Sequence, residues 1–250
     1  MALLGLTGCT TVPETGRSQF NLLTPADEMK LGITVFDQMK AETPISKDAA
    51  INKMVTDVGQ RIAAVAELPN AQWEFVVFES EQANAFCLPG GKVGVYTGIL
   101  PITKSEAGLA TVIGHEVAHA VARHGGERVS TSVALETVGG VASELSNRLS
   151  DPQVKEAVVT AYGLGATVGV QLPFSRKQES EADYIGLLYM ARAGYEPEEA
   201  VKFWQRFAEH NQKAGGDTIW FLRTHPLDED RIRKLQEWLP EAKGQFRPAN

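Results

Sequence analysis

Cysteine is scarce in this sequence. Only Cys9 and Cys87 occur among 250 residues, so one disulfide at most can form, which excludes a disulfide-stapled scaffold. Cys87 lies in an apolar run (AFCLP), where a buried and inert thiol is expected. Basic residues are also in the minority, because 24 Lys and Arg against 31 Asp and Glu give a net charge of −7. A nucleic-acid-binding protein needs a basic face, so we expect no nucleic-acid partner.

Long apolar runs are missing as well. The best candidate, residues 157–170, contains Thr and Gly and is shorter than the roughly 20 residues that a membrane-spanning helix needs. The hydrophobic fraction of 43% is ordinary for a globular protein. A chain of this length fits one domain or two small ones. We therefore expect a soluble body with its own core.

The first residues resemble a processing signal. Residues 6–9 (LTGC) match a bacterial lipobox, in which the chain is cut before Cys9 and the thiol carries lipid. The basic region that precedes a complete signal peptide is missing, which suggests a truncated start. Residues 10–18 would then form a polar tether after the anchor. The alternative is a frayed apolar terminus. We expect residues 1–20 to be signal remnant and tether, and residues 21–250 to be one domain.

Local patterns predict a mainly helical chain with few strands. Thr103 and Glu106 have capping-box spacing, and residues 125–126 (GG) offer a helix stop after them. The expected helices cover about 24–40, 48–66, 104–124, 127–147, 152–170, 176–193, 197–212 and 228–238, and the expected strands cover about 73–78, 85–88 and 92–96. One α+β domain with a small antiparallel sheet is the simplest fold class.

The expected helix over 104–124 carries the motif HEVAH. Its residues His115 and His119 lie four apart, on one helix face, where both imidazoles reach one metal ion. Neutral imidazole suits Zn²⁺. Glu116 lies where a carboxylate takes a proton from a zinc-bound water that attacks a carbonyl. The bland interpretation is two surface histidines beside a solvated carboxylate.

A catalytic zinc site needs a third protein ligand. The acidic stretch after residue 175 offers Glu179 and Asp183, four apart on one helix face. One carboxylate would bind zinc and the other would orient a ligand histidine through its distal nitrogen. Glu181 lies on the opposite side of that helix and should face elsewhere. Spacing alone leaves open a register that uses Glu181 instead.

Taken together, these motifs resemble zinc metallopeptidase family 48, the gluzincins of the HtpX and CaaX prenyl protease type. The resemblance runs from about residue 22 to residue 235. It is carried, in the family's order, by Asn84-Ala85-Phe86, Pro89-Gly90-Gly91, HEVAH at 115–119, SRKQESEAD at 175–183 and Thr224-His225-Pro226. It implies a zincin-like metallopeptidase domain with an HExxH active-site helix and one Zn²⁺ per chain.

The resemblance also implies roles for single residues. The family's ExxxD pattern places Glu179 as the third ligand and Asp183 as the orienting residue. Residues Asn84, Ala85 and Phe86 would form an edge strand where an extended substrate pairs. His225 would stabilise the oxyanion or occupy the fourth zinc position and keep the enzyme latent, and a plain packing role stays open.

Two histidines fall outside this scheme. His124 is five residues from His119, off the ligand face, and is expected to be structural. His210 has no partner motif and is expected at the surface.

The absence of spanning segments makes the chain most similar to the soluble periplasmic lipoprotein members of the family, BepA- and LoiP-like, without a helical-repeat domain. The resemblance implies a zinc metalloendopeptidase that hydrolyses unfolded or misfolded cell-envelope proteins. Lipidated Cys9 would attach it to a membrane, with the outer membrane favoured over the inner one. The alternative is a latent enzyme or a proteolytically silent, zinc-bound chaperone. In the latent enzyme, residues 138–172 would act as a mobile lid.

Overall fold

The computed structural model describes residues 9–136, 174–213, 220–226 and 229–248. Its strands are β1 (Cys9–Thr11), β2 (Ser18–Phe20), β3 (Glu74–Phe78), β4 (Ala85–Leu88) and β5 (Lys92–Tyr96). Its helices are α1 (Pro25–Glu42), α2 (Ala49–Ala63), α3 (Leu100–Thr103), α4 (Glu106–Val121), α5 (His124–Glu136), α7 (Arg176–Arg192), α8 (Glu198–Lys213), α9 (Trp220–Thr224) and α10 (Glu229–Gly244), with a 3₁₀ turn at Thr97–Ile99. The α+β class is confirmed.

The central sheet has three strands in the order β3-β5-β4. The pair β4–β5 is antiparallel, as expected for the small sheet. The pair β3–β5 is parallel, with Glu74 opposite Lys92. The sheet is therefore mixed rather than wholly antiparallel, because β5 returns between its two predecessors instead of at an edge.

Side chains of the three strands alternate between two apolar clusters, as the two-residue period of a strand requires. One set packs with α2 and α4 in the main core, and it comprises Val77, Ala85, Cys87, Val93 and Val95. The other set packs against α1, where Phe78, Phe86 and Leu88 surround Phe36. The buried position of Cys87 confirms the expectation for that thiol, whose pKa burial raises well above its ordinary value.

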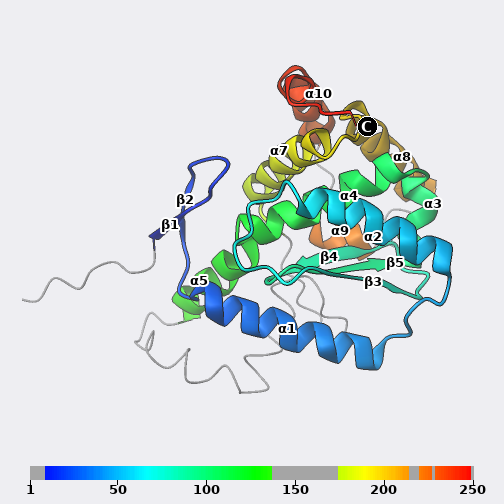
Figure 1. Cartoon of the computed structure of the whole chain (residues 1–250). Coiled ribbons are helices and arrows are strands. Elements are labelled where there is room, and N and C mark those ends of the chain that lie inside the picture. The colour runs from blue at the N-terminus through cyan, green and yellow to red at the C-terminus, as the bar shows by residue number, and fades with distance from the viewer. Residues whose placement is uncertain (1–8, 137–173, 214–219, 227–228, 249–250) are drawn as a thin grey trace, which may run out of the picture.

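Helix α4 is the centre of the molecule. Its residues from Gly108 to Val121 are all buried, as expected for a helix that is enclosed on every side. It packs on the sheet and on α2, and its other sides contact α7 and α8. Figure 1 shows the sheet with α1 on one side and α4 on the other, and α7 beyond α4.

The ends of α4 differ from the predicted ones. Its N-cap is Ser105, whose hydroxyl accepts from the backbone N–H of Gly108. Thr103 instead ends the short helix α3, and the left-handed Lys104 separates the two helices. At the other end the left-handed residue is Arg123, with φ of 55°, and not one of the two glycines. A new helix, α5, begins directly after it.

Strands β1 and β2 pair in an antiparallel hairpin, with Cys9 opposite Phe20. We call residues 9–20 the N-terminal hairpin. Part of the segment expected as a tether is thus folded, and Glu14 and Arg17 of its turn form ion pairs with the helical body. The division at residue 20 stays a prediction.

Several expectations fall outside the described residues. These are most of the lipobox, the expected helix over 152–170, the second part of that over 127–147, and the whole of the expected lid over 138–172. Among the described helices, none combines the length and the apolar character needed to cross a membrane.

Candidate active site

Two glycines let the helices that carry the site approach each other closely. A Cβ on Gly186 of α7 would lie 2.8 Å from the backbone nitrogen of His115, and a Cβ on Gly114 of α4 would lie 3.0 Å from the Gly186 carbonyl oxygen. The backbones of α4 and α7 therefore touch at this crossing. The acidic face of α7 is thereby brought directly over the HEVAH motif.

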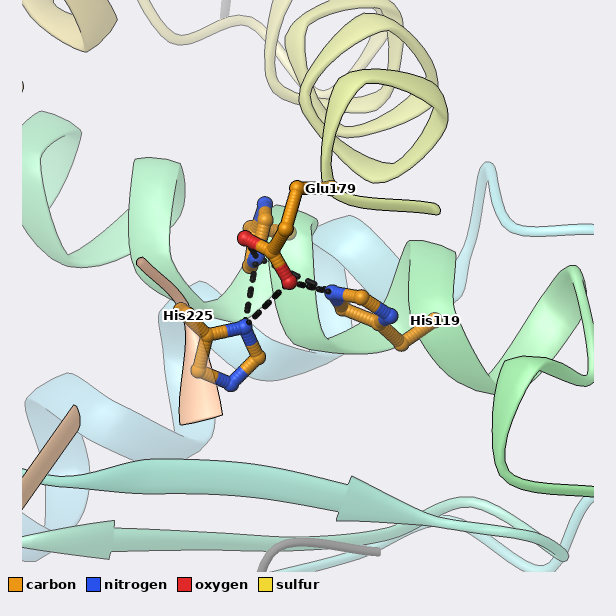
Figure 2. Close-up of side chains that lie close together, drawn as sticks. His119, Glu179 and His225 are labelled. Carbon is orange, nitrogen blue, oxygen red and sulfur yellow. Dashed lines mark hydrogen bonds and ion pairs between the residues drawn. The ribbon is translucent and has the colours of Figure 1, made fainter. Parts of the chain in front are cut away.

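Four side chains converge there: His115, His119, Glu179 and His225. Nε2 of His115 lies 3.1 Å from Nε2 of His119 and 3.2 Å from Nδ1 of His225. Oε1 of Glu179 lies 3.2 Å from His119 and 2.9 Å from His225. Figure 2 shows His119, Glu179 and His225 pointing toward one another.

These separations suit a zinc ion. Four ligands at about 2.0–2.1 Å in a tetrahedron lie about 3.3–3.4 Å apart, close to the 2.9–3.2 Å between neighbouring ligand atoms here. Three imidazoles and one carboxylate are also a donor set that zinc accepts. The structure brings together all three predicted ligands and adds His225 at the fourth corner.

Electrostatics prepare two of these groups for a metal, which binds neutral imidazole and ionised carboxylate. Burial lowers the pKa of His119 well below its ordinary value. Burial would raise the pKa of Glu179, but His225 and Arg231 outweigh it and lower that pKa well below the ordinary value. Burial also opposes a charge on His115, but Glu179 and Asp183 outweigh it and raise the pKa of His115 to about 9. A metal must displace that proton.

Asp183 lies where the orienting residue was expected. Its Oδ1 is 2.9 Å from Nδ1 of His115, on the side of the ring away from the cluster. Its other oxygen, Oδ2, lies 2.6 Å from Nε of Arg231. Carboxylates in this position fix the tautomer and the ring angle of metal-binding histidines.

Arg231 is a site residue that the sequence did not indicate. Its side chain is buried, and it forms ion pairs with both Asp183 and Glu179. It also lies over the ring of Trp204, 3.4 Å from the centroid. The sequence around Arg231 does not distinguish it from Arg233, two residues further on, whose side chain is half exposed. The sequence feature that relates Arg231 to the site is its position six residues after His225.

Glu116 points into the same buried region. Its Oε1 lies 3.4 Å from Nε2 of His225 and has no hydrogen-bond partner among the described residues. Burial raises the pKa of the Glu116 carboxyl above its ordinary value. A carboxylate whose pKa is shifted upward is suited to take and release a proton near neutral pH.

His225 is held between two aromatic rings. It stacks on Phe221 at a centroid distance of 4.4 Å and on Phe174 at 5.2 Å. Its backbone N–H donates to the Phe221 carbonyl, which fixes it at the end of α9. Its ring is therefore fixed with Nδ1 toward the cluster and Nε2 toward Glu116.

The predicted edge strand lies at the edge of the sheet. Strand β4 contains Ala85 and Phe86 and follows Asn84 directly, and it pairs with β5 on one side in the order given above. Asn84, Ala85 and Phe86 are all buried, with at most 4% exposed. The five residues of the cluster and its base are equally enclosed. A peptide therefore reaches this edge only after the surroundings change.

Of the other predicted residues, Glu181 faces away from the cluster and bonds His124 instead. His124 is fully buried and lies outside the four-residue cluster. His210 is exposed, as predicted.

The sequence profile of Peptidase family M48 matches residues 49–239. This range contains every site residue described above, whereas the N-terminal hairpin lies outside it. The chain belongs to Peptidase family M48. Members of this family are zinc metallopeptidases, and the observed cluster fits that metal.

Three relatives illustrate the match. The mitochondrial metalloendopeptidase OMA1 of Schizosaccharomyces pombe is 37% identical over 238 residues, covering 92% of this chain and 66% of the relative. The OMA1 of Saccharomyces cerevisiae is 38% identical over 180 residues, covering 70% of this chain and 49% of the relative. The β-barrel assembly-enhancing protease of Escherichia coli K12 is 27% identical over 225 residues, covering 89% and 46%. The chain thus spans about half to two thirds of these relatives.

Proposed function

We propose that this M48 chain is a zinc-dependent metalloendopeptidase with His115, His119 and Glu179 as zinc ligands. The observation that carries the proposal is the convergence of these three groups at zinc-like separations beside the buried carboxylate of Glu116. When bound, zinc would polarise a peptide carbonyl and acidify water.

The chain's own residues supply the proton transfers. Glu116 accepts the proton of the attacking water and delivers it to the leaving amide nitrogen, and its raised pKa suits both steps. Asp183 holds His115 in the tautomer whose Nε2 faces the cluster. His225, close to Glu116 through Nε2, would donate to the developing oxyanion.

The proposed substrates are unfolded or misfolded proteins of the cell envelope. An edge strand such as β4 recognises extended backbone with little regard for sequence, and Asn84, Ala85 and Phe86 would form that contact. The lipobox at residues 6–9 supports a periplasmic enzyme attached through lipidated Cys9, on the outer membrane. One relative's name refers to β-barrel assembly, which agrees with an envelope role, whereas another is named mitochondrial.

A specific observation favours a second candidate, a latent form of the same enzyme. Nδ1 of His225 takes the fourth corner of the cluster, where a catalytic zinc keeps a position for water. The stacked rings of Phe174 and Phe221 hold it there. A chain that stays inactive with zinc bound would instead act as a binding module.

The test is cleavage of casein by purified, zinc-loaded protein, followed over time beside Glu116→Gln. We expect the parent to cut casein and the variant to lose nearly all turnover, by about 100-fold or more, while zinc content stays equal. Equal cleavage by both proteins would contradict the role of Glu116. Loss of zinc from Glu116→Gln would contradict its assignment as base rather than ligand.

His225→Ala separates the active from the latent form. In a latent enzyme this variant cuts casein faster than the parent, because the fourth position is freed. In the open enzyme it cuts more slowly, because an oxyanion donor is lost. Silence of both proteins with zinc present would favour the binding module.

A further inference from the structure

The second nitrogen of His119 has an unusual partner. While Nε2 faces the cluster, Nδ1 lies 2.8 Å from Nδ1 of His124. The other helix histidine, His115, instead contacts the carboxylate of Asp183 directly. Histidine ligands are oriented by the acceptor that their distal N–H meets. For His119 that acceptor is another imidazole.

One set of proton positions satisfies the whole chain of contacts. If His119 binds the metal through Nε2, its Nδ1 carries the hydrogen and donates to Nδ1 of His124. His124 is then protonated on Nε2, which lies 2.9 Å from Oε2 of Glu181. The carboxylate of Glu181 thus fixes the tautomer of His124, and His124 fixes that of His119.

The break after α4 explains how a histidine five residues away reaches back to His119. Arg123 is in the left-handed region, with φ of 55°, so α4 ends at Val121 and a separate helix, α5, begins at His124. The side chain of Arg123 donates to Oε2 of Glu28 at 2.7 Å and to the carbonyl oxygen of Leu23 at 2.6 Å. These contacts stabilise a conformation that is costly for a residue with a side chain.

The series of contacts that begins at His119 ends at the N-terminal hairpin. Nε of Arg17 lies 2.7 Å from Oε2 of Glu181, and the hydroxyl of Thr15 donates to the other oxygen. Two further nitrogens of Arg17 contact the carboxylate of Glu127 at 2.7 and 2.9 Å. Arg17 and Glu181 are both largely buried, so this pair is held in a defined geometry.

Helix α7 connects the two sides. Glu179, in the metal cluster, and Glu181 are two residues apart, about 200° around the helix. One helix therefore presents a ligand carboxylate to the cluster and a supporting carboxylate to the hairpin. A movement of the hairpin would disturb Glu181 and, through His124, the ring of His119.

We propose that His124 and Glu181 are positioning residues for the ligand His119, and that Arg17 makes the N-terminal hairpin a part of the metal centre. This inference rests on the proposed zinc site. It assigns the hairpin a role beyond that of a tether, because the contact between Arg17 and Glu181 affects how tightly the metal is bound.

The test measures metal binding by the full chain, independent of activity. Zn²⁺ affinity comes from competition with a chromophoric chelator, and the ligand geometry comes from the visible absorption of the Co²⁺ form. Glu181→Gln keeps the shape but removes the charge, and we expect about 10–100-fold weaker Zn²⁺ binding and an altered Co²⁺ band. Arg17→Gln should weaken binding less, and Arg17→Lys should restore part of the loss. His124→Phe should weaken binding at least as much as Glu181→Gln.

Arg192→Gln is the matched control. Arg192 on α7 contacts Glu14 of the same hairpin at 2.6 Å, but it does not contact Glu181 or His124. We expect it to bind Zn²⁺ like the parent, and thermal unfolding without metal checks that each variant folds. His124→Phe replaces a fully buried ring. If it does not fold, the result for Glu181→Gln decides the test.

Two results would overturn the inference. The first is parent-like affinity and absorption in Glu181→Gln. The second is an equal loss in Arg17→Gln and Arg192→Gln, which would make the effect one of general hairpin docking. If the parent itself binds neither Zn²⁺ nor Co²⁺, the proposed function fails and this inference fails with it.

Discussion

Arg231 supplies the positive charge that the buried acids of the site need before a metal arrives. Asp183 and Glu179 are both buried, and a carboxylate without a counter-charge in such a place is costly. Arg231 contacts both of them at 2.6 and 3.1 Å. Its guanidinium also stacks on Trp204. Its role is thus to keep α7 and α10 together around a charged centre.

Replacing Arg231 should therefore destabilise the metal-free protein. For Arg231→Met we expect the free energy of unfolding to fall by about 3–5 kcal/mol, since one partner of a buried ion pair is removed. Urea denaturation with a chelator present measures this change. Added zinc should recover part of it, because the metal then compensates the charge of Glu179.

Arg233→Met is the control for that experiment. Arg233 is on the same helix, is half exposed, and pairs with Asp230 and Glu237. Exposed pairs of this kind contribute at most about 1 kcal/mol. Equal losses from the two substitutions would show that the buried pairs of Arg231 contribute no more than surface ones.

Sequence reasoning reached the residues whose partners are close along the chain. His115 and His119 share a helix face, as do Glu179 and Asp183, so their spacing is informative. Arg231 could not be found in this way, because its partners come from another helix. His124 lies outside the cluster, as predicted, but its contact with His119 was missed, because the spacing argument assumes a continuous helix and α4 ends before residue 123.

At the scale of elements, the crossing of α4 and α7 decides whether the site exists. The two helices touch through Gly114 and Gly186, with no side chain between them. This contact determines how far Glu179 lies from His119. Any side chain at the crossing must push the helices apart, because the atoms it would meet belong to the backbone.

Gly186→Ala tests the crossing. The added Cβ would lie 2.8 Å from the nitrogen of His115, so we expect a loss of about 1–3 kcal/mol in stability together with weaker Zn²⁺ binding. Gly244→Ala is the control, because a Cβ there meets no atom within 4 Å and a helical alanine is favoured over glycine. Urea denaturation and chelator competition measure both effects. Unchanged metal affinity in Gly186→Ala would contradict the importance of the crossing.

The elements themselves were predictable to different degrees. The boundaries of α1, α2 and α7 follow from local caps such as Thr24, Asp48 and Ser175. The partners of the strands do not, because the insertion of β5 between β3 and β4 depends on residues that are far apart in sequence. The small hairpin β1–β2 was missed for the same reason, since contacts with α5 and α7 hold it.

At the scale of the whole molecule, one ionic contact joins three distant segments. The carboxylate of Glu127 on α5 accepts from Arg17 of the N-terminal hairpin and, at 2.8 Å, from the amide of Gln178 on α7. Burial would raise the pKa of Glu127, but these hydrogen bonds outweigh it and lower the pKa below the ordinary 4.5. The contact therefore favours the folded state only when Glu127 is ionised.

The direction of the pH effect follows from that shift. Because the folded pKa lies below the unfolded one, Glu127 stabilises the protein fully above about pH 4.5, and this stabilisation is lost as the pH falls through that value toward the folded pKa. We expect Glu127→Gln to be less stable than the parent at pH 6 and to approach it in stability at pH 3. Urea denaturation in chelator at several pH values measures the difference.

In an Arg17→Gln background the same substitution should cost less stability, because the strongest donor to Glu127 is already gone. If the free energies of unfolding of the parent and Glu127→Gln differ by the same amount from pH 6 to pH 3, the ionised form of Glu127 does not stabilise the contact between the hairpin and the helical body.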